Sequence, residues 1–324
     1  PNDGKTEKRN PGIHEKRKPG LDVFDLEQEL SHLVGQESVK KFLLQWEKGL
    51  KLDRRREEVF NRIVRVDPPH MCFLGNPGTG KTKIAVLVAS VLAQLGLVAK
   101  GELVQVQRAD LVAGAIGQTA IKTKAKIEEA KGGVLFIDEA YRLFQEESTK
   151  DFGREAIDEI MAAMNTGDVV MIFAGYRKEM QAFMGGNPGL FRRISKQFFF
   201  EDYKTDELTN ILKLNVKLSG FQLDTEVTDE QLTDIIERKT IARQRAQMNG
   251  GIPQQMFRKA KWFLDERLDM DACEDELMTF NLGDLENSLE EMKNNWSQFA
   301  PDDEEGDIRS SVINLEVGRD SLVS

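Results

Sequence analysis

One eight-residue stretch constrains the fold of this chain more than any other. Residues 75–82 read Gly-Asn-Pro-Gly-Thr-Gly-Lys-Thr, a glycine-rich turn that ends in a lysine and a hydroxyl side chain. Glycines let the backbone curl until its N–H groups converge on one spot, where they can hold phosphate oxygens. Lys81 adds a positive charge for the terminal phosphates, and the Thr82 hydroxyl suits Mg²⁺. The pattern therefore predicts a phosphate-binding loop.

The flanking sequence is what such a loop requires. Residues 70–74 are a short apolar run, which predicts a buried parallel strand. Residues 83–95 contain no Pro or Gly and predict a helix that ends at Gly96. A helix N-terminus adds its own dipole to anion binding. This context favours a nucleotide site over a plain glycine-rich turn.

Between residues 70 and 203, apolar runs alternate with helix-like stretches. The runs predict strands at 70–74, 103–107, 134–137, 169–174 and 197–200. The helix-like stretches lie at 83–95, 119–131, 152–165 and 178–184. Alternation of this kind predicts an α/β fold, the P-loop NTPase αβα sandwich with a five-stranded parallel sheet. Right-handed crossovers would place the loop at the C-terminal edge of that sheet.

Helical spacing predominates on either side of this region. Residues 26–65 have it, with an interruption at Val34-Gly35-Gln36. Beyond Tyr203 it predicts a small all-α lid subdomain with helices at 204–218, 228–246, 253–268 and 282–298. We therefore expect four parts: a disordered basic linker (1–22), a large αβα nucleotide-binding subdomain (23–203), a helical lid subdomain (204–298) and a disordered acidic tail (299–324).

Composition excludes several classes of function. The 324 residues carry a formal net charge of −10, so we expect no nucleic-acid partner, which would need a basic face. Two cysteines, Cys72 and Cys273, are too few for a disulfide framework and predict an intracellular, cytoplasmic protein, with nucleus and plastid left open. The sequence holds no apolar run of about 18 residues, so we expect no membrane span.

The predicted strand at 134–137 ends in two carboxylates, Asp138 and Glu139. Beside a phosphate loop, Asp138 can hold Mg²⁺ through its water shell, and Glu139 can orient or deprotonate an attacking water. An exposed acidic pair is the plainer alternative. We expect ATP and Mg²⁺ as ligands, with Thr82 and Asp138 at the metal. The residues expected to contact the nucleotide here are Asn76, Pro77, Gly78, Thr79, Gly80, Lys81, Thr82 and Asp138.

The two motifs resemble Walker A and Walker B of the AAA+ ATPases. Three further stretches resemble the CbbX/CfxQ branch: GGVLFIDEAY at 132–141, IFAGY at 172–176 and NPG at 187–189. The stretches QMNGG at 247–251 and LDERL at 264–268 are more similar to plant and algal ankyrin-repeat AAA proteins, whose repeats would lie upstream of Pro1. The resemblance implies a homo-oligomeric ring, a hexamer, with ATP between subunits and a protein client that the sequence does not name.

The resemblance also implies further site residues. An arginine finger reaching the neighbouring subunit would be Arg192 or Arg193, of which Arg193 is the better match, with plain surface arginines as the alternative. Tyr176 takes the place of a polar sensor, and a packing tyrosine fits equally well. Val34 and Gly35 match the segment that contacts adenine, with Val34 as an ordinary core residue the alternative.

Two departures from the family pattern leave the function open. Where relatives carry lid arginines, residues 251–255 read Gly-Ile-Pro-Gln-Gln, and Arg258 follows a turn later. The pore triplet is Ala115-Ile116-Gly117, without the aromatic side chain that grips a client. One function is a chaperone-like ATPase that remodels a protein partner, CbbX-like and Rubisco-activase-like. The other is a low-turnover, nucleotide-gated scaffold or binding module.

Overall fold

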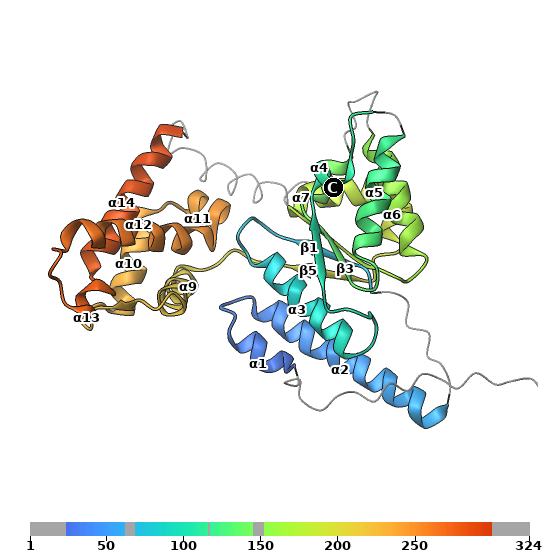
Figure 1. Ribbon diagram of the computed structural model, residues 1–324, viewed down its shortest axis with the longest axis horizontal. Helices are drawn as coiled ribbons and strands as arrows, with labels where there is room; N and C mark the ends of the chain where they lie inside the picture. The colour runs from blue at the N-terminus through green and yellow to red at the C-terminus, as the bar shows by residue number, and fades with distance from the viewer. Residues whose placement is uncertain (1–23, 62–68, 116, 145–151, 300–324) are drawn as a thin grey trace, which may run out of the picture.

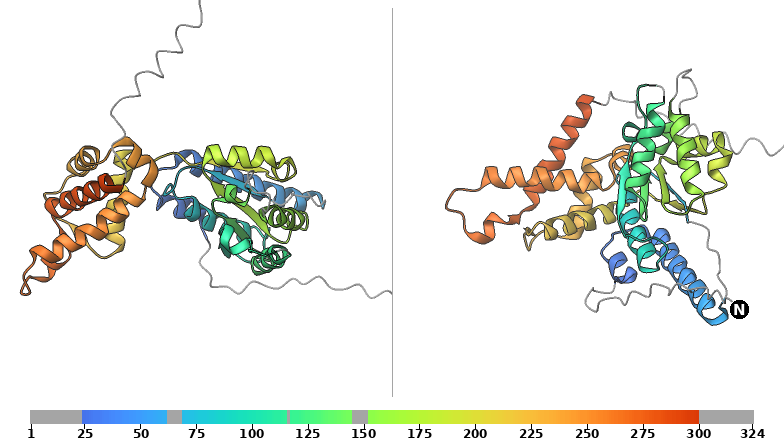
Figure 2. Two further views of the ribbon diagram at one scale, coloured as in Figure 1. Left: turned by 90° about the horizontal axis from the view of Figure 1, so that it is seen from above. Right: turned by 45° about the vertical axis from the view of Figure 1, so that its right-hand side comes forward.

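The computed structural model describes residues 24–61, 69–115, 117–144 and 152–299 (Figure 1). It consists of a layered part built on a parallel sheet and a helical subdomain that lies to one side of it (Figures 1 and 2). The linker predicted for 1–22 and, apart from residue 299, the tail predicted for 299–324 lie outside the described residues. Among the helices of the described residues, none combines the length and the apolar character needed to cross a bilayer.

The central sheet has five strands, all parallel, in the order β2-β3-β4-β1-β5. Their bounds are β1 Met71–Leu74, β2 Leu103–Val106, β3 Val134–Ile137, β4 Val170–Gly175 and β5 Lys196–Phe199. Parallel pairing brings the C-terminal ends of all five strands to one edge, so the segments that follow β1, β3 and β4 meet there. The predicted five-stranded parallel sheet is confirmed.

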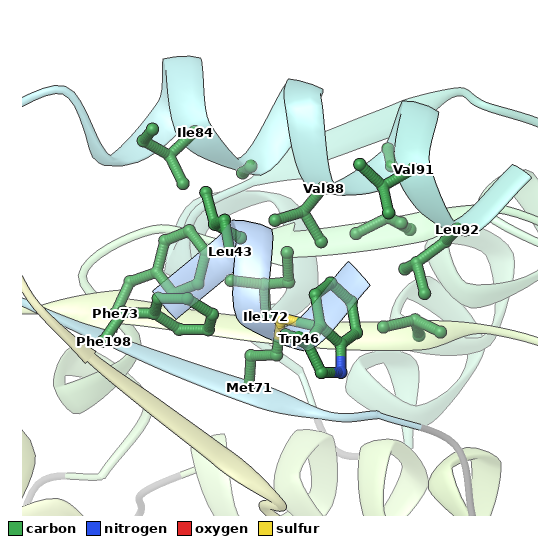
Figure 3. Packing of buried hydrophobic residues seen from close by; sticks show 14 of the residues in the cluster. Leu43, Trp46, Met71, Phe73, Ile84, Val88, Val91, Leu92, Ile172 and Phe198 are labelled. Atoms are coloured by element: carbon green, nitrogen blue, oxygen red, sulfur yellow. The ribbon is translucent and has the colours of Figure 1, made fainter. Parts of the chain in front are cut away.

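The strands are apolar throughout because both faces of the sheet are covered. In β1, Met71 and Phe73 point to one face, whereas Cys72 and Leu74 point to the other. The first face packs against α1 (Leu26–Ser31), α2 (Glu37–Phe60) and α3 (Lys81–Gln94). Figure 3 shows Leu43 and Trp46 of α2 and the α3 side chains packed over the sheet residues Met71, Phe73 and Ile172. The ring of Phe42 in α2 lies 4.8 Å from that of Phe198 in β5, and this edge-on contact helps fix α2 to the sheet.

The opposite face carries the helices that connect the later strands. These are α4 (Arg108–Leu111), α5 (Gln118–Glu129), the 3₁₀ turn η1 (Ala140–Leu143), α6 (Gly153–Met164), α7 (Arg177–Gly186) and α8 (Pro188–Phe191). Ile157 and Ile160 of α6 and Met180 of α7 are buried in the apolar cluster on this face. The sheet is thereby enclosed on both sides, and only its edges remain for a site.

The second part of the chain is a helical subdomain with its own core. Its helices are α9 (Thr205–Leu218), α10 (Asp229–Lys239), α11 (Ala242–Met248), α12 (Gly251–Arg267), α13 (Glu274–Leu277) and α14 (Leu282–Phe299). Leu208 and Leu212 of α9, Met256 and Leu264 of α12, and Leu285 of α14 are fully buried within it. The predicted lid is helical, and it follows the sheet directly.

Three details differ from the expectation. The single helix predicted for 228–246 is two helices, because Thr240 is extended and its hydroxyl bonds back to Ile236 O, which ends α10. A two-stranded parallel pair, β6 (Gln222–Leu223) and β7 (Thr279–Phe280), joins segments far apart in sequence and is too short to show a periodic pattern. The helix predicted for 26–65 is split at Gly35 and Gln36, as expected, but its second part ends at Phe60.

Candidate functional site

The glycine-rich loop joins β1 to α3 and wraps around the first turn of that helix. Gly78 and Gly80 have φ values of 72° and 93°, a left-handed conformation that glycine adopts without strain. The Thr79 hydroxyl, fully buried, donates to Asn76 O at 2.8 Å and braces the loop from inside. The loop therefore forms a fixed hollow over the N-terminus of α3, where helix dipole and free N–H groups favour an anion.

Lys81 is the first residue of α3 and turns back into this hollow. Its Nζ donates to Gly75 O at 2.9 Å and to Asn76 O at 2.7 Å. Burial lowers the pKa of Lys81, and the negative charges of Asp138 and Glu139 partly offset that effect. The ammonium group is thus held by weak carbonyl acceptors in a desolvated place, where phosphate oxygens would be stronger partners.

The two carboxylates stand at the adjoining end of β3. Asp138 accepts a hydrogen bond from the Glu139 backbone N–H at 3.1 Å. Glu139 has a φ of 49°, a left-handed conformation that turns the chain sharply into η1. Its two oxygens are engaged, one by the Tyr141 hydroxyl at 3.3 Å and the other by Arg142 Nη1 at 3.1 Å. The glutamate is therefore oriented by its own turn.

A cavity of about 600 Å³ brings the loop and the carboxylates together, within the usual size range of small-molecule sites. The expected residues that line it are Val34, Pro77, Gly78, Thr79, Gly80, Lys81, Thr82, Asp138, Glu139 and Tyr176. Gly35 and Asn76 are not on its wall. Asn76 turns its side chain toward Asp202, and Gly35, with a φ of 66°, lies against Tyr203 and Glu207.

The helical subdomain supplies the opposite wall, which sequence reasoning largely missed. The wall residues from this side are Tyr203, Ile211, Leu214, Asn215, Gly250, Gly251 and Gln254. The Tyr203 hydroxyl donates to Thr79 O at 3.2 Å, and burial raises the pKa of that tyrosine. Asn215 lies one turn after Ile211 on α9, a spacing that places both on one helix face. The sequence offered only this helical spacing as a sign that α9 lines the cavity, and plain core packing explains the spacing equally well.

Comparison with known proteins identifies the family. Residues 71–201 match the family described as ATPase family associated with various cellular activities (AAA), and residues 202–293 match a domain of unknown function (DUF8495). The protein CfxQ homolog of Pyropia yezoensis is 41% identical over 218 residues, which cover 66% of this chain and 71% of the relative. The chain belongs to the CbxX/CfxQ family of AAA ATPases.

Two further relatives bear on function. The chromosomal protein CbxX of Cupriavidus necator is 48% identical over 159 residues, 48% of this chain and 50% of that protein, so the match spans about half of that relative's length. The chloroplastic ribulose bisphosphate carboxylase/oxygenase activase of Cyanidioschyzon merolae is 40% identical over 205 residues, 62% of this chain and 68% of the relative.

Among solved structures, the FIGL-1 AAA domain in complex with ADP superposes with a TM-score of 0.53. That match covers 86% of this chain and 98% of that one at 20% identity, and it shows the fold alone.

In this AAA ATPase the two candidate finger arginines do not line the cavity. Arg192 and Arg193 follow α8 and precede β5, at the end of the sheet opposite the loop. Arg193 donates to Asn165 Oδ1 and to Gly189 O. Tyr176, by contrast, immediately precedes α7 and lies at the cavity wall, with its ring 5.8 Å from that of Tyr141.

The segment expected to form a pore loop, residues 115–117, is only partly described. Ala115 is exposed, Gly117 has a φ of 74° and precedes α5, and Ile116 lies outside the described residues. An exposed alanine offers little surface for gripping a client chain. The described residues of this segment, Ala115 and Gly117, therefore supply no large side chain for such a grip.

The residues present fit Mg²⁺ held together with phosphates. Thr82 and Asp138 face one cavity, and their hydroxyl and carboxylate oxygens are hard ligands of the kind that Mg²⁺ prefers. Within the described ranges, no group of three or more His, Cys, Asp or Glu side chains forms a separate metal cage. Mg²⁺ usually keeps several waters and takes one or two protein oxygens plus phosphate, so a two-residue contribution is sufficient.

Proposed function

We propose that this chain binds ATP with Mg²⁺ in the cavity between sheet and lid, and hydrolyses it within a ring of identical subunits to remodel a protein client. The observation that carries the proposal is the shared cavity of Lys81, Asp138 and Glu139. A phosphate loop alone would serve binding, whereas a carboxylate placed across from it can also act on water. Family membership supports the ATPase activity.

Each side chain takes a role that its position favours. The loop N–H groups and Lys81 would hold the phosphates, and the base would lie toward Val34 and Ile211. Thr82 and Asp138 would hold Mg²⁺, which neutralises charge on the phosphate oxygens. Glu139 would orient the attacking water and take its proton. Arg193 of the next subunit would complete the site, and Tyr176 would bond that water or the terminal phosphate.

The proposed ring is motivated by the need for an arginine from a neighbouring subunit. Phosphoryl transfer gains about 10³–10⁵ in rate from an arginine at the transferred group. Among the described residues lining the cavity, the cations are Lys81 and Lys83, and no arginine is present. A neighbouring copy that presents its Arg193 would supply it, and six copies would close the ring. The client is proposed by analogy with the relative from Cyanidioschyzon merolae, whose name is that of a Rubisco activase. Rubisco in a plastid or a bacterial cytoplasm is therefore the first client to test.

One observation favours the alternative of a nucleotide-gated scaffold. The lid residues on the cavity wall include Gly251 and Gln254 but, within the described part of the chain, no basic side chain. Exposed Arg258 lies outside the wall. A lid without a cation at the terminal phosphate would couple less strongly to hydrolysis.

Steady-state turnover distinguishes the two functions. The purified full chain is assayed with saturating ATP, with and without Mg²⁺ and with the client added. Mg²⁺-dependent turnover that the client stimulates supports the remodelling ATPase. Turnover below about 10⁻³ s⁻¹ in every condition, the range of a nucleotide switch that lacks its arginine finger, supports the scaffold.

A further inference from the structure

The lid residue Asn249 is held in an unusual way. Its backbone has φ 45° and ψ −123°, a conformation that favours glycine and persists only where the surroundings enforce it. Its side chain is fully buried. The amide donates to Asp202 Oδ1 at 2.9 Å and to Ala246 O at 2.8 Å, and its oxygen accepts from Tyr203 N at 2.9 Å. Every hydrogen-bonding group of this side chain therefore has a partner.

Asp202 connects this lid residue to the phosphate loop. It lies in the segment between β5 and α9, and its two carboxylate oxygens accept from Asn76 Nδ2 at 2.9 and 3.0 Å. The same carboxylate accepts the Asn249 amide. Hydrogen bonds to an ionised acceptor are stronger than neutral ones, so Asp202 is a firm joint between the loop and the lid.

The backbones of loop and lid also touch directly. Gly250 N donates to Gly78 O at 3.1 Å. A Cβ at Gly78 would lie 2.3 Å from Met248 O, and a Cβ at Gly250 would lie 2.9 Å from Gly78 O. The lid turn and the loop are therefore in direct backbone contact, with no room for a side chain at either glycine.

The chain of contacts reaches the phosphate-binding lysine. Asn76, whose side chain bonds Asp202, also accepts Lys81 Nζ through its carbonyl at 2.7 Å. Bound phosphates would draw the Lys81 ammonium group away from the Asn76 carbonyl. Without that hydrogen bond, Asn76 could shift. The lid presents no cation to the cavity among the described wall residues, so it reaches the phosphate end through hydrogen bonds to the loop: this path, the Gly250 N bond to Gly78 O and the Tyr203 hydroxyl bond to Thr79 O.

We infer that Asn249 and Asp202 are positioning residues that transmit occupancy of the phosphate loop to the lid, in place of a lid cation that touches the nucleotide. The inference rests on the proposed function, since it concerns how bound ATP moves the lid. Neither residue contacts substrate. They act through Asn76 and Gly78 of the loop.

The test measures lid position and turnover in the full chain. Asn249→Gly removes the side chain while keeping a backbone that glycine adopts readily. Asp202→Asn replaces the charged acceptor, and Asp206→Asn, an exposed acid four residues later, is the matched control.

Spin labels at exposed Cys273 and at Val86→Cys on α3 report the distance between lid and core. Burial raises the pKa of Cys72 to about 12, so that thiol stays unlabelled. Mixing the labelled chain with an excess of unlabelled chain leaves mostly one labelled subunit in each assembly, so that the measured distance is the one within a subunit.

In chains that carry Glu139→Gln to retain ATP, we expect Mg·ATP to shift this distance in the otherwise unsubstituted protein and in Asp206→Asn. Asn249→Gly and Asp202→Asn should bind ATP with affinity within about threefold but lose the shift. With Glu139 restored, their turnover should fall about tenfold, in the range of coupling between sites. A purely structural role would lower the unfolding temperature without abolishing the shift in folded protein.

Three outcomes overturn the inference. The first is a full nucleotide-dependent shift in both positioning variants, and the second is an ATP-bound protein whose lid distance never changes. The third is absence of ATP binding by the unsubstituted chain, which refutes the proposed function itself and is recognised by the binding measurement alone. If Asn249→Gly does not fold, Asp202→Asn decides the question, because its exposed side chain leaves both cores intact.

Discussion

In this AAA ATPase, Arg193 Nε donates a hydrogen bond to Asn165 Oδ1 at 2.8 Å. Arg193 precedes β5, whereas the cavity lies beyond the C-terminal ends of the strands, so the sheet separates this guanidinium from the carboxylates of its own subunit. Ser195 N donates to His70 O at the start of β1, which confirms that this segment lies at the N-terminal edge. The position of Arg193 is therefore compatible with the proposed role toward a nucleotide bound to another copy of the chain, and not with one toward the cavity of its own subunit.

Arg193→Ala should lose turnover by about 10³-fold while keeping ATP affinity, because the charge acts on the transferring phosphoryl group. Mixing this variant with Glu139→Gln subunits should restore part of the activity, since each subunit supplies what its neighbour lacks. Turnover is measured across mixing ratios. Arg192→Ala is the matched comparison, and a larger loss there would assign the finger to Arg192. If neither arginine variant regains turnover at any mixing ratio with Glu139→Gln subunits, neither arginine acts in trans.

Lys81→Ala should abolish ATP binding. The loop would lose its side-chain cation, whose pKa is lowered by burial and which is held ready by carbonyl groups. Binding is followed by titration with a fluorescent ATP analogue. Lys48→Ala, an exposed lysine on α2, controls for a general change of charge. Micromolar affinity in the Lys81 variant would contradict the role given to this residue.

Glu139→Gln should bind ATP normally and turn it over about 10²–10⁴-fold more slowly, the usual range for loss of a general base. The glutamine keeps an oxygen that can accept from the Tyr141 hydroxyl. Quenched reactions with radiolabelled ATP show whether nucleotide remains bound and uncleaved. Wild-type turnover in this variant would exclude Glu139 as the base.

How far the sequence predicts the site depends on whether a residue acts through local or distant partners. The loop at 75–82 and the pair Asp138–Glu139 are short motifs whose conformation follows from neighbouring residues, and they were found where the sheet brings them together. Asp202 and Asn249 are 47 residues apart. Nothing in their local sequence indicates that they meet, because their contact depends on how the lid docks. The β6–β7 pair was missed for the same reason.

Buried His70 predicts a pH dependence of stability. Its Nδ1 accepts from Met171 N–H, so its Nε2 donates to Met164 O at 3.1 Å as a neutral ring. Burial lowers the pKa of His70 in the folded protein; the hydrogen bond to Met164 O partly offsets this effect, and the charge of Arg193 adds to it. As pH falls below about 6.5, the unfolded chain takes up a proton that the folded chain resists.

The free energy of unfolding should therefore be greatest above the unfolded-state pKa and fall as pH decreases toward the folded-state pKa. His70→Gln should be less stable at pH 8, since the two bonds are imperfectly replaced, but should lose less stability on acidification. Urea unfolding between pH 5 and 8, the interval in which histidine titrates, checks both slopes. If the free energy of unfolding depends on pH equally in the unsubstituted protein and in His70→Gln, His70 is not the source of that dependence.

The close backbone contact at Gly78 limits how the helical subdomain can be exchanged between members of the family. Its Cα faces Met248 O so closely that no side chain fits, and Gly250 meets it with a hydrogen bond. The seam between the two subdomains thus runs through the nucleotide site itself rather than beside it. A chimaera that takes its lid from another member of the family will assemble a working site only if residues 202–203 and 248–250 are transplanted together with matching loop residues.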